Sequence, residues 1–146
     1  MAYFSDRLPH IVRREDLAIM LAPTYAATAN VDDEEAKDRL LRALADAALL
    51  DDIYLSLSAA LTARAGPRIG VDALMDKLSK GIGARRSRVK PPSATPELFA
   101  FLVRINLLIG EAPANMRSVL ESEKGRAAMK KGLQDVGAHL VRELLK

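Results

Sequence analysis

Two groups of cationic side chains are the strongest candidates for chemistry in this sequence. The first group consists of Arg85, Arg86, Arg88 and Lys90, within the stretch GIGARRSRVKPP. Residues 77–96 carry six cations and no acid. A guanidinium presents a planar fork of donors that matches two phosphate oxygens, so this group suits the backbone of a nucleic acid. The alternative is that the stretch is only a hydrated connection between helices.

The second group consists of Lys124, Arg126, Lys130 and Lys131. These residues gather where the last helix is expected to begin, and cations near a helix N-terminus oppose the helix dipole. Arg126 and Lys130 are also four residues apart, a spacing at which like charges slightly destabilise a helix. A bound anion would offset both costs, whereas the alternative is an ordinary solvated helix face.

One histidine has carboxylates at helical spacing, which could bind a divalent metal or tune the histidine pKa. Asp135 lies four residues before His139, and Glu143 lies four residues after it, so all three share one helix face. The same spacing is ordinary for polar pairs on a helix surface. We therefore predict no catalytic residue, no metal and no cofactor.

Sequence motifs give no support for an enzyme. The chain has no signature of a serine hydrolase, a zinc protease, a phosphate-binding loop or a calcium-binding loop. The GIGARR run lacks a third glycine and follows a predicted helix rather than a strand, so it does not indicate dinucleotide binding. The chain also has no cysteine, which excludes disulfides and thiolate metal sites. We predict that the protein is not an enzyme.

The two halves of the chain differ in charge. Residues 1–76 hold 8 Lys/Arg and 13 Asp/Glu, a net of −5, and residues 77–146 hold 14 Lys/Arg and 6 Asp/Glu, a net of +8. Together they give the net charge of +3. A basic half favours an anionic partner, and opposite halves favour head-to-tail self-association. The alternative is one globule with mixed surface charge.

The sequence predicts no targeting or membrane-spanning segment. The first residues contain no basic stretch followed by an apolar core, so no signal peptide is expected. The most apolar run, 98–109, is interrupted by Arg104 and Asn106. It is also shorter than the ~20 residues that cross a bilayer. A cytoplasmic protein is the prediction.

The elements that must position these groups are all predicted to be helices. Apolar residues recur at helical spacing, and alternation with a period of two is absent. We predict an all-α fold, with residues 1–146 forming a single compact domain of six to seven helices. A nearly all-apolar central helix is expected at about 97–109, with Phe99 and Phe101 in the core. Residues 81–96 are expected to form a basic loop bounded by glycine and proline.

Capping residues predict several helix boundaries. Asp32, with Glu35 three residues later, has the pattern of a capping box. Thr95 followed by Pro96 is typical of a helix start. Gly81 is expected to end a short helix over 71–80.

Further boundaries follow from apolar periodicity and helix breakers. A first helix is expected over 11–21, with Pro23 ending or kinking it. Asp51 or Asp52 is expected to open another helix, and Pro113 a further one. The last helix is expected over about 126–145. Gly132 and Gly137 lie inside it and each costs ~1 kcal/mol relative to alanine, which indicates close backbone packing against a neighbour.

These observations predict a non-enzymatic helical subunit that binds the phosphate backbone of a nucleic acid. Aromatic residues do not interleave with the cations, which argues against recognition of single-stranded bases. The expected target is therefore a duplex, DNA or RNA, bound with little sequence specificity. The charge asymmetry favours a homo-oligomer or a multi-subunit assembly, such as a capsid-like or nucleoprotein structure. The alternative is a helical module that binds another protein through a charge-complementary or apolar groove.

Overall fold

The all-α prediction is confirmed. A computed structural model describes residues 3–66, 69–112 and 114–146, and helices are the regular elements within them. In chain order they are α1 (Tyr3–Ile11), α2 (Arg14–Ala29), α3 (Asp33–Ala43), α4 (Ala47–Arg64), α5 (Val71–Arg85), the 3₁₀ turn η1 (Arg86–Arg88), α6 (Pro96–Leu108), α7 (Ala114–Glu121) and α8 (Glu123–Leu144). None of these described helices combines the length and apolarity needed to cross a bilayer.

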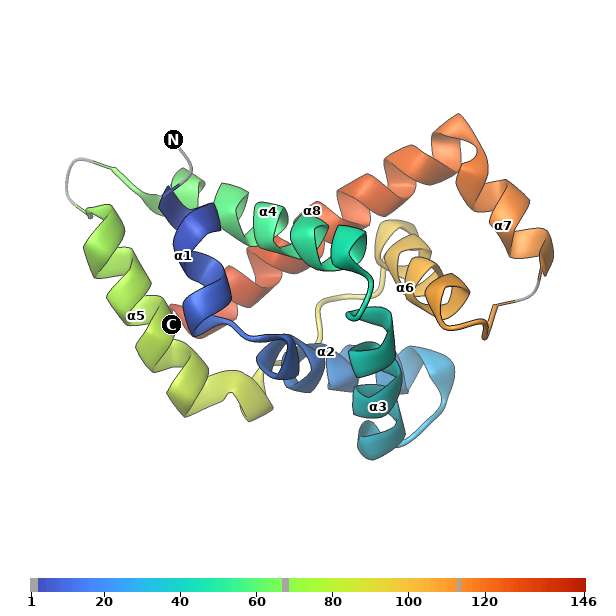
Figure 1. Ribbon diagram of the computed structural model, residues 1–146, viewed down its shortest axis with the longest axis horizontal. Coiled ribbons are helices and arrows are strands. Elements are labelled where there is room, and N and C mark those ends of the chain that lie inside the picture. The colour runs from blue at the N-terminus through green and yellow to red at the C-terminus, as the bar shows by residue number, and fades with distance from the viewer. Residues whose placement is uncertain (1–2, 67–68, 113) are drawn as a thin grey trace.

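The longest helix, α8, organises the molecule, and α4, α5, α6 and α7 all pack against it (Figure 1). Its two interior glycines confirm the predicted close packing. A Cβ atom at Gly132 would lie 2.0 Å from the carbonyl oxygen of Glu97, and one at Gly137 would lie 2.0 Å from Ser56 Oγ. The glycines therefore allow α6 and α4 to approach α8 more closely than any side chain would permit.

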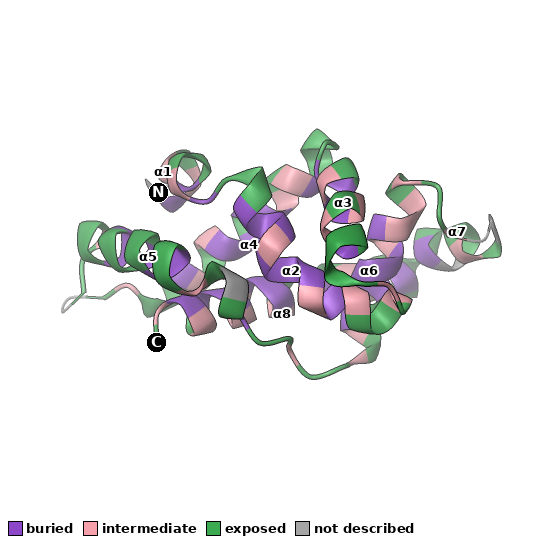
Figure 2. Ribbon diagram, turned by 90° about the horizontal axis from the view of Figure 1, so that it is seen from below, coloured by how far each residue is buried: buried purple, intermediate pink, exposed green. Residues whose placement is uncertain are grey.

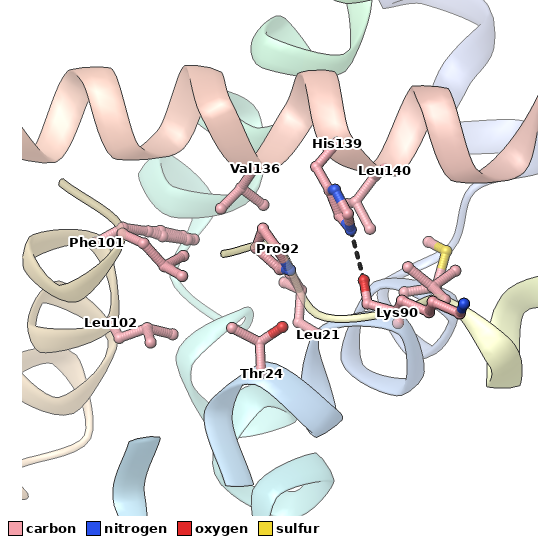
Figure 3. Close-up of a pocket in the computed structure, with 12 residues that line it drawn as sticks. Leu21, Thr24, Lys90, Pro92, Phe101, Leu102, Val136, His139 and Leu140 are labelled. Carbon is pink, nitrogen blue, oxygen red and sulfur yellow. Dashed lines mark hydrogen bonds between the residues drawn. The ribbon is translucent and has the colours of Figure 1, made fainter. Parts of the chain in front are cut away.

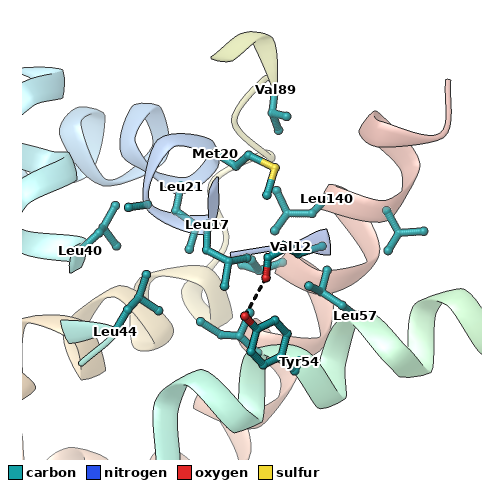
Figure 4. Close-up of a cluster of buried hydrophobic side chains, with 14 of the residues drawn as sticks. Val12, Leu17, Met20, Leu21, Leu40, Leu44, Tyr54, Leu57, Val89 and Leu140 are labelled. Atoms are coloured by element: carbon teal, nitrogen blue, oxygen red, sulfur yellow. Dashed lines mark hydrogen bonds between the residues drawn. The ribbon is translucent and has the colours of Figure 1, made fainter. Parts of the chain in front are cut away.

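The main core lies where α2 meets α4 and α8. Leu17 of α2, Leu57 of α4 and Leu140 of α8 are among its buried side chains (Figure 4). The buried Tyr54 donates its hydroxyl proton to the carbonyl oxygen of Val12 at 2.7 Å, which joins α4 to the turn between α1 and α2. Burial raises the pKa of Tyr54, because the phenolate would lose its hydration. Figure 2 shows that the buried residues lie on the faces that the helices turn toward one another.

Two predicted helix starts are confirmed. The side chain of Asp32 accepts a hydrogen bond from the backbone N–H of Glu35 at 2.8 Å, where α3 begins. Thr95 accepts one from the N–H of Leu98 at 3.0 Å, and Pro96 is the first residue of α6. Each side-chain oxygen satisfies a backbone donor that has no partner within the helix.

The prediction that Gly81 ends its helix is wrong, because α5 continues to Arg85 and is followed directly by η1. The basic loop expected over 81–96 therefore shortens to residues 89–95. Gly81 packs against the last turn of α8, where an added Cβ would lie 2.0 Å from the carbonyl oxygen of Leu144. The close packing of α5 against α8 offsets the low helix propensity of glycine. A prediction from helix propensity alone does not include this packing energy.

The N-terminal prediction of one helix over 11–21 is also wrong. Two helices, α1 and α2, meet near Val12, and α2 continues through Pro23 to Ala29. The residues after the proline remain helical because Thr24 and Tyr25 are buried against the rest of the fold. The stabilisation from tertiary packing therefore outweighs the loss of the backbone hydrogen bond that proline cannot make.

Three other helix starts differ from their predicted positions. Asp46, rather than Asp51 or Asp52, caps α4 and accepts from the N–H of Leu49 at 3.0 Å. Ser122 caps α8, so that helix begins before residue 126. α7 is described from Ala114, and Pro113 lies outside the described residues.

The apolar helix α6 packs against α3, α7 and α8. Phe101 is 2% exposed, as predicted for the core, whereas Phe99 is 53% exposed, so its prediction is wrong. Apolar residues all around the helix could not indicate which face meets solvent. The polar Asn106 has a structural role, because its side-chain oxygen accepts a hydrogen bond from the buried Tyr25 hydroxyl of α2.

Candidate anion-binding surface

The shortened basic connection, residues 89–95, runs between α2 and α8 to the start of α6 (Figures 1 and 3). Val89 is buried, and Val89 and Pro92 line an apolar cavity of about 10 Å³ beneath the connection. A cavity of this size holds at most about one water molecule. Val89 therefore anchors the start of the connection to the core, whereas Lys90, Pro91, Ser93 and Ala94 are exposed.

Two hydrogen bonds attach this connection to α8. His139 Nε2 donates to the carbonyl oxygen of Lys90 at 2.5 Å (Figure 3). The backbone N–H of Lys90 donates to Glu143 Oε1 at 3.3 Å. Both backbone groups of Lys90 are thus held, while its ammonium group remains exposed beside the C-terminal half of α8.

Two cations of the first group have partners inside the protein. Arg86 Nη1 lies 2.6 Å from Asp16 Oδ1, and Asp16 is only 6% exposed. The other carboxylate oxygen of Asp16 accepts from the N–H of Arg13 at 3.0 Å. Arg85 Nη1 donates weakly to the carbonyl oxygen of Glu143 at 3.4 Å. Arg85 therefore links α5 to α8, and Arg86 links η1 to α2.

The cations of α8 lie on two different sides of the helix. Successive residues are rotated by about 100°, so Lys130 and Lys131 point in clearly different directions. By the same rotation Lys124 and Lys131 share one side, whereas Arg126 and Lys130 share the side that faces α4. All four are exposed. The second predicted group is therefore divided between two surfaces.

Arg142 extends the row formed by Lys124 and Lys131. At about 1.5 Å per residue, the three cations are spaced by about 10 and 16 Å along the helix axis. Lys90 and Arg142 also border one cleft of about 460 Å³ between α8 and residues 89–95. We call these four exposed residues, Lys90, Lys124, Lys131 and Arg142, the basic stripe.

Two acids beside the C-terminal part of the basic stripe are already paired with cations. Asp135 Oδ1 lies 3.1 Å from Lys131 Nζ, and Glu143 forms an ion pair with Lys146. The hydrogen bond from Lys146 is the main cause that lowers the pKa of Glu143, and the N–H of Lys90 lowers it further. In the described part of the chain, Lys90, Lys124 and Arg142 have no acid at ion-pair distance.

The basic stripe thus combines Lys90 of the first predicted group with Lys124 and Lys131 of the second. Arg88 is exposed on η1, while Arg126 and Lys130 lie on the opposite flank of α8. Arg142 was missed by the sequence analysis. It follows Lys131 by eleven residues, about three helical turns, and this spacing is the signal that could have identified it.

The histidine with flanking carboxylates has other partners in the fold. His139 bonds the carbonyl of Lys90, Asp135 pairs with Lys131, and Glu143 accepts from Lys90 and Lys146. Across residues 3–66, 69–112 and 114–146, no three His, Asp or Glu side chains gather closely enough to hold a metal ion.

No protein-family model matches the sequence, and neither a curated protein nor a solved structure matches the chain.

Proposed function

We propose that the protein is a non-enzymatic helical subunit that binds the phosphate backbone of a nucleic-acid duplex along the basic stripe. One observation carries the proposal: exposed cations recur on a single side of one long helix, and Lys90 borders a cleft with one of them, Arg142, where His139 and Glu143 hold its backbone. A phosphate backbone is a regular line of negative charge, and neutralising it releases condensed counterions. The helix fixes the backbone positions of Lys124, Lys131 and Arg142, so only their side chains need to be ordered when they bind.

The ion pair within the basic stripe does not prevent this binding. Lys131 and Asp135 are both well exposed, and such surface pairs contribute only about 0–1 kcal/mol. A phosphate group can therefore replace Asp135 as the partner of Lys131 at small cost. Contacts to phosphates position a protein without identifying bases, so we expect little sequence preference.

We further propose that several copies assemble on one nucleic acid. The support is the acidic first turn of α3, where Asp33, Glu34 and Glu35 are all exposed. This surface can face a cationic surface of a neighbouring copy, in the heterologous manner that produces rings or filaments. Repeated copies would give the capsid-like or nucleoprotein assembly that the charge asymmetry favours.

A salt titration of duplex binding tests the proposed function. Fluorescence anisotropy of a labelled DNA duplex and a labelled RNA duplex gives the association constant at each salt concentration. Four phosphate contacts predict a slope of about −3 to −4 in log K against log[salt], because each contact contributes about −0.9. Duplexes of unrelated sequence are expected to bind within about threefold of one another. Absence of binding at low salt, or an affinity that does not change with salt, contradicts the proposal.

A further inference from the structure

A second surface lies on the other flank of α8, facing α4. It is a groove of about 390 Å³, which we call the α4–α8 groove. Its wall and floor include Leu55 and Ala59 from α4, and Arg126, Met129, Lys130 and Leu133 from α8. No residue of the basic stripe lines it.

The floor of the α4–α8 groove is apolar and regularly spaced. Leu55 and Ala59 are four residues apart on one helix, and Met129 and Leu133 are four residues apart on the other. The Leu55 side chain is 60% exposed, the highest value among the large apolar residues that the structure describes as exposed. Two apolar ridges with a hollow between them are the geometry that receives an amphipathic helix.

The groove is held in a fixed shape by contacts beneath it. Ser56 Oγ donates to the carbonyl oxygen of Leu133 at 2.8 Å, which ties α4 directly to the backbone of α8. The close approach at Gly137 lies one turn farther along. A groove that does not need to form upon binding loses less conformational entropy when a ligand enters it.

The rim of the groove is cationic. Arg126 and Lys130 are exposed, and in the described chain neither forms an ion pair with an acid. The one acid that lines the groove, Asp52, is paired with Arg104 at 2.9 Å. The unpaired charge around the apolar floor is therefore positive.

We propose that the α4–α8 groove binds an amphipathic helix of a partner protein, with its apolar face on Leu55, Met129 and Leu133 and acidic side chains beside Arg126 and Lys130. This proposal does not rest on the proposed nucleic-acid binding. It also commits to a partner rather than a second copy. Among the described helices, α3 has the most acidic residues, but it buries Ala36, Leu40 and Ala43 within its own fold, so these residues are not available to insert into the groove of a second copy.

The test uses the full chain and two synthetic helical peptides of about 15 residues. In the first peptide, leucines at positions i, i+4 and i+7 form one face and glutamates flank them. The second peptide is identical except that lysines replace the glutamates. Binding is followed by fluorescence anisotropy, and circular dichroism verifies that each protein variant remains folded. Leu55→Ser tests the floor, because the exposed side chain can be replaced without disturbing the core.

The acidic peptide should bind the wild type, and the basic peptide should bind at least about tenfold more weakly. Leu55→Ser and the double variant Arg126→Gln/Lys130→Gln should each weaken acidic-peptide binding by about tenfold or more. Lys124→Gln/Lys131→Gln, which removes the same charge from the other side of α8, should leave it unchanged. Failure of the wild type to bind, equal binding of both peptides, or no effect of Leu55→Ser overturns the proposal.

Two other occupants give distinguishable results, each of which overturns the proposal of a partner helix. If the wild type self-associates in analytical ultracentrifugation and Leu55→Ser abolishes this association, the groove receives a second copy. If Arg126→Gln/Lys130→Gln weakens duplex binding as strongly as Lys124→Gln/Lys131→Gln does, the cationic rim belongs to the nucleic-acid surface. Loss of duplex binding alone, with peptide binding intact, refutes the proposed function and leaves the groove proposal standing.

Discussion

Asp16 shows how a single buried residue engages one cation of the first group, Arg86. Its two carboxylate oxygens accept hydrogen bonds from the Arg13 backbone and from Arg86. These contacts cap α2 and attach η1 to it at the same point. The sequence could not predict this contact, because 70 residues separate Arg86 from Asp16.

Replacing Asp16 by alanine is expected to lower the free energy of unfolding by about 2 kcal/mol. The change removes a helix cap and the partner of a partly buried cation. Asp33→Ala is the matched control, because Asp33 is an exposed first-turn residue of α3. This change should lower the free energy of unfolding by only about 0.5 kcal/mol, which is typical of surface substitutions and of helix-dipole effects. Urea unfolding measures both, and equal losses would contradict the structural role of Asp16.

Glu143 gives a prediction about pH. Its pKa is lowered from the ordinary 4.5, first by the hydrogen bond from Lys146. A carboxylate with a lowered pKa in the folded state stabilises the fold above its unfolded pKa, and this stabilisation disappears as pH falls through the folded pKa. Glu143→Gln should therefore unfold more easily than the wild type at pH 7, and the difference should shrink below about pH 4. A difference in urea midpoint that is constant with pH would contradict this role.

At the scale of elements, two glycines of α5 give opposite predictions. Gly81 and Gly83 are two residues apart in one helix. A Cβ at Gly81 would lie 2.0 Å from the Leu144 carbonyl oxygen, whereas nothing lies within 4 Å of one at Gly83. Gly83→Ala should raise the free energy of unfolding by up to about 1 kcal/mol through helix propensity. Gly81→Ala should lower it, because α5 and α8 must separate. Thermal unfolding compares the pair, and stabilisation by both changes would show that the two helices are not in close contact.

The elements also show which features of the fold could be predicted from the sequence. Asp32 and Thr95 each accept a hydrogen bond from the backbone N–H three residues later, so the local sequence was enough to predict these two helix starts. Gly81 was misread, and Pro23 does not end its helix, because packing against distant helices offsets the cost of each residue. The close packing at Gly132 and Gly137 was predicted, since glycine inside a long amphipathic helix indicates a neighbouring backbone. The identity of those neighbours required the structure.

At the scale of the whole molecule, α8 separates two surfaces that the sequence had merged. The basic stripe lies on one flank, and the α4–α8 groove lies on the other. Sequence clustering grouped Lys124, Arg126, Lys130 and Lys131, although helix rotation separates them into two pairs. Lys90 joined the basic stripe only because residues 89–95 pack beside α8. The types of residue at the candidate site could thus be predicted, but their assignment to one surface or the other could not.

The measurement that tests the central claim most directly compares two double variants of α8 in duplex binding at several salt concentrations. Lys124→Gln/Lys131→Gln and Arg126→Gln/Lys130→Gln remove the same charge from the same helix. The basic-stripe variant should weaken binding and reduce the magnitude of the salt slope by about 1.8, about 0.9 for each lost phosphate contact. The groove variant should change the slope by less than about 0.5. Equal effects of both variants, or no effect of the basic-stripe variant, would contradict binding along the basic stripe.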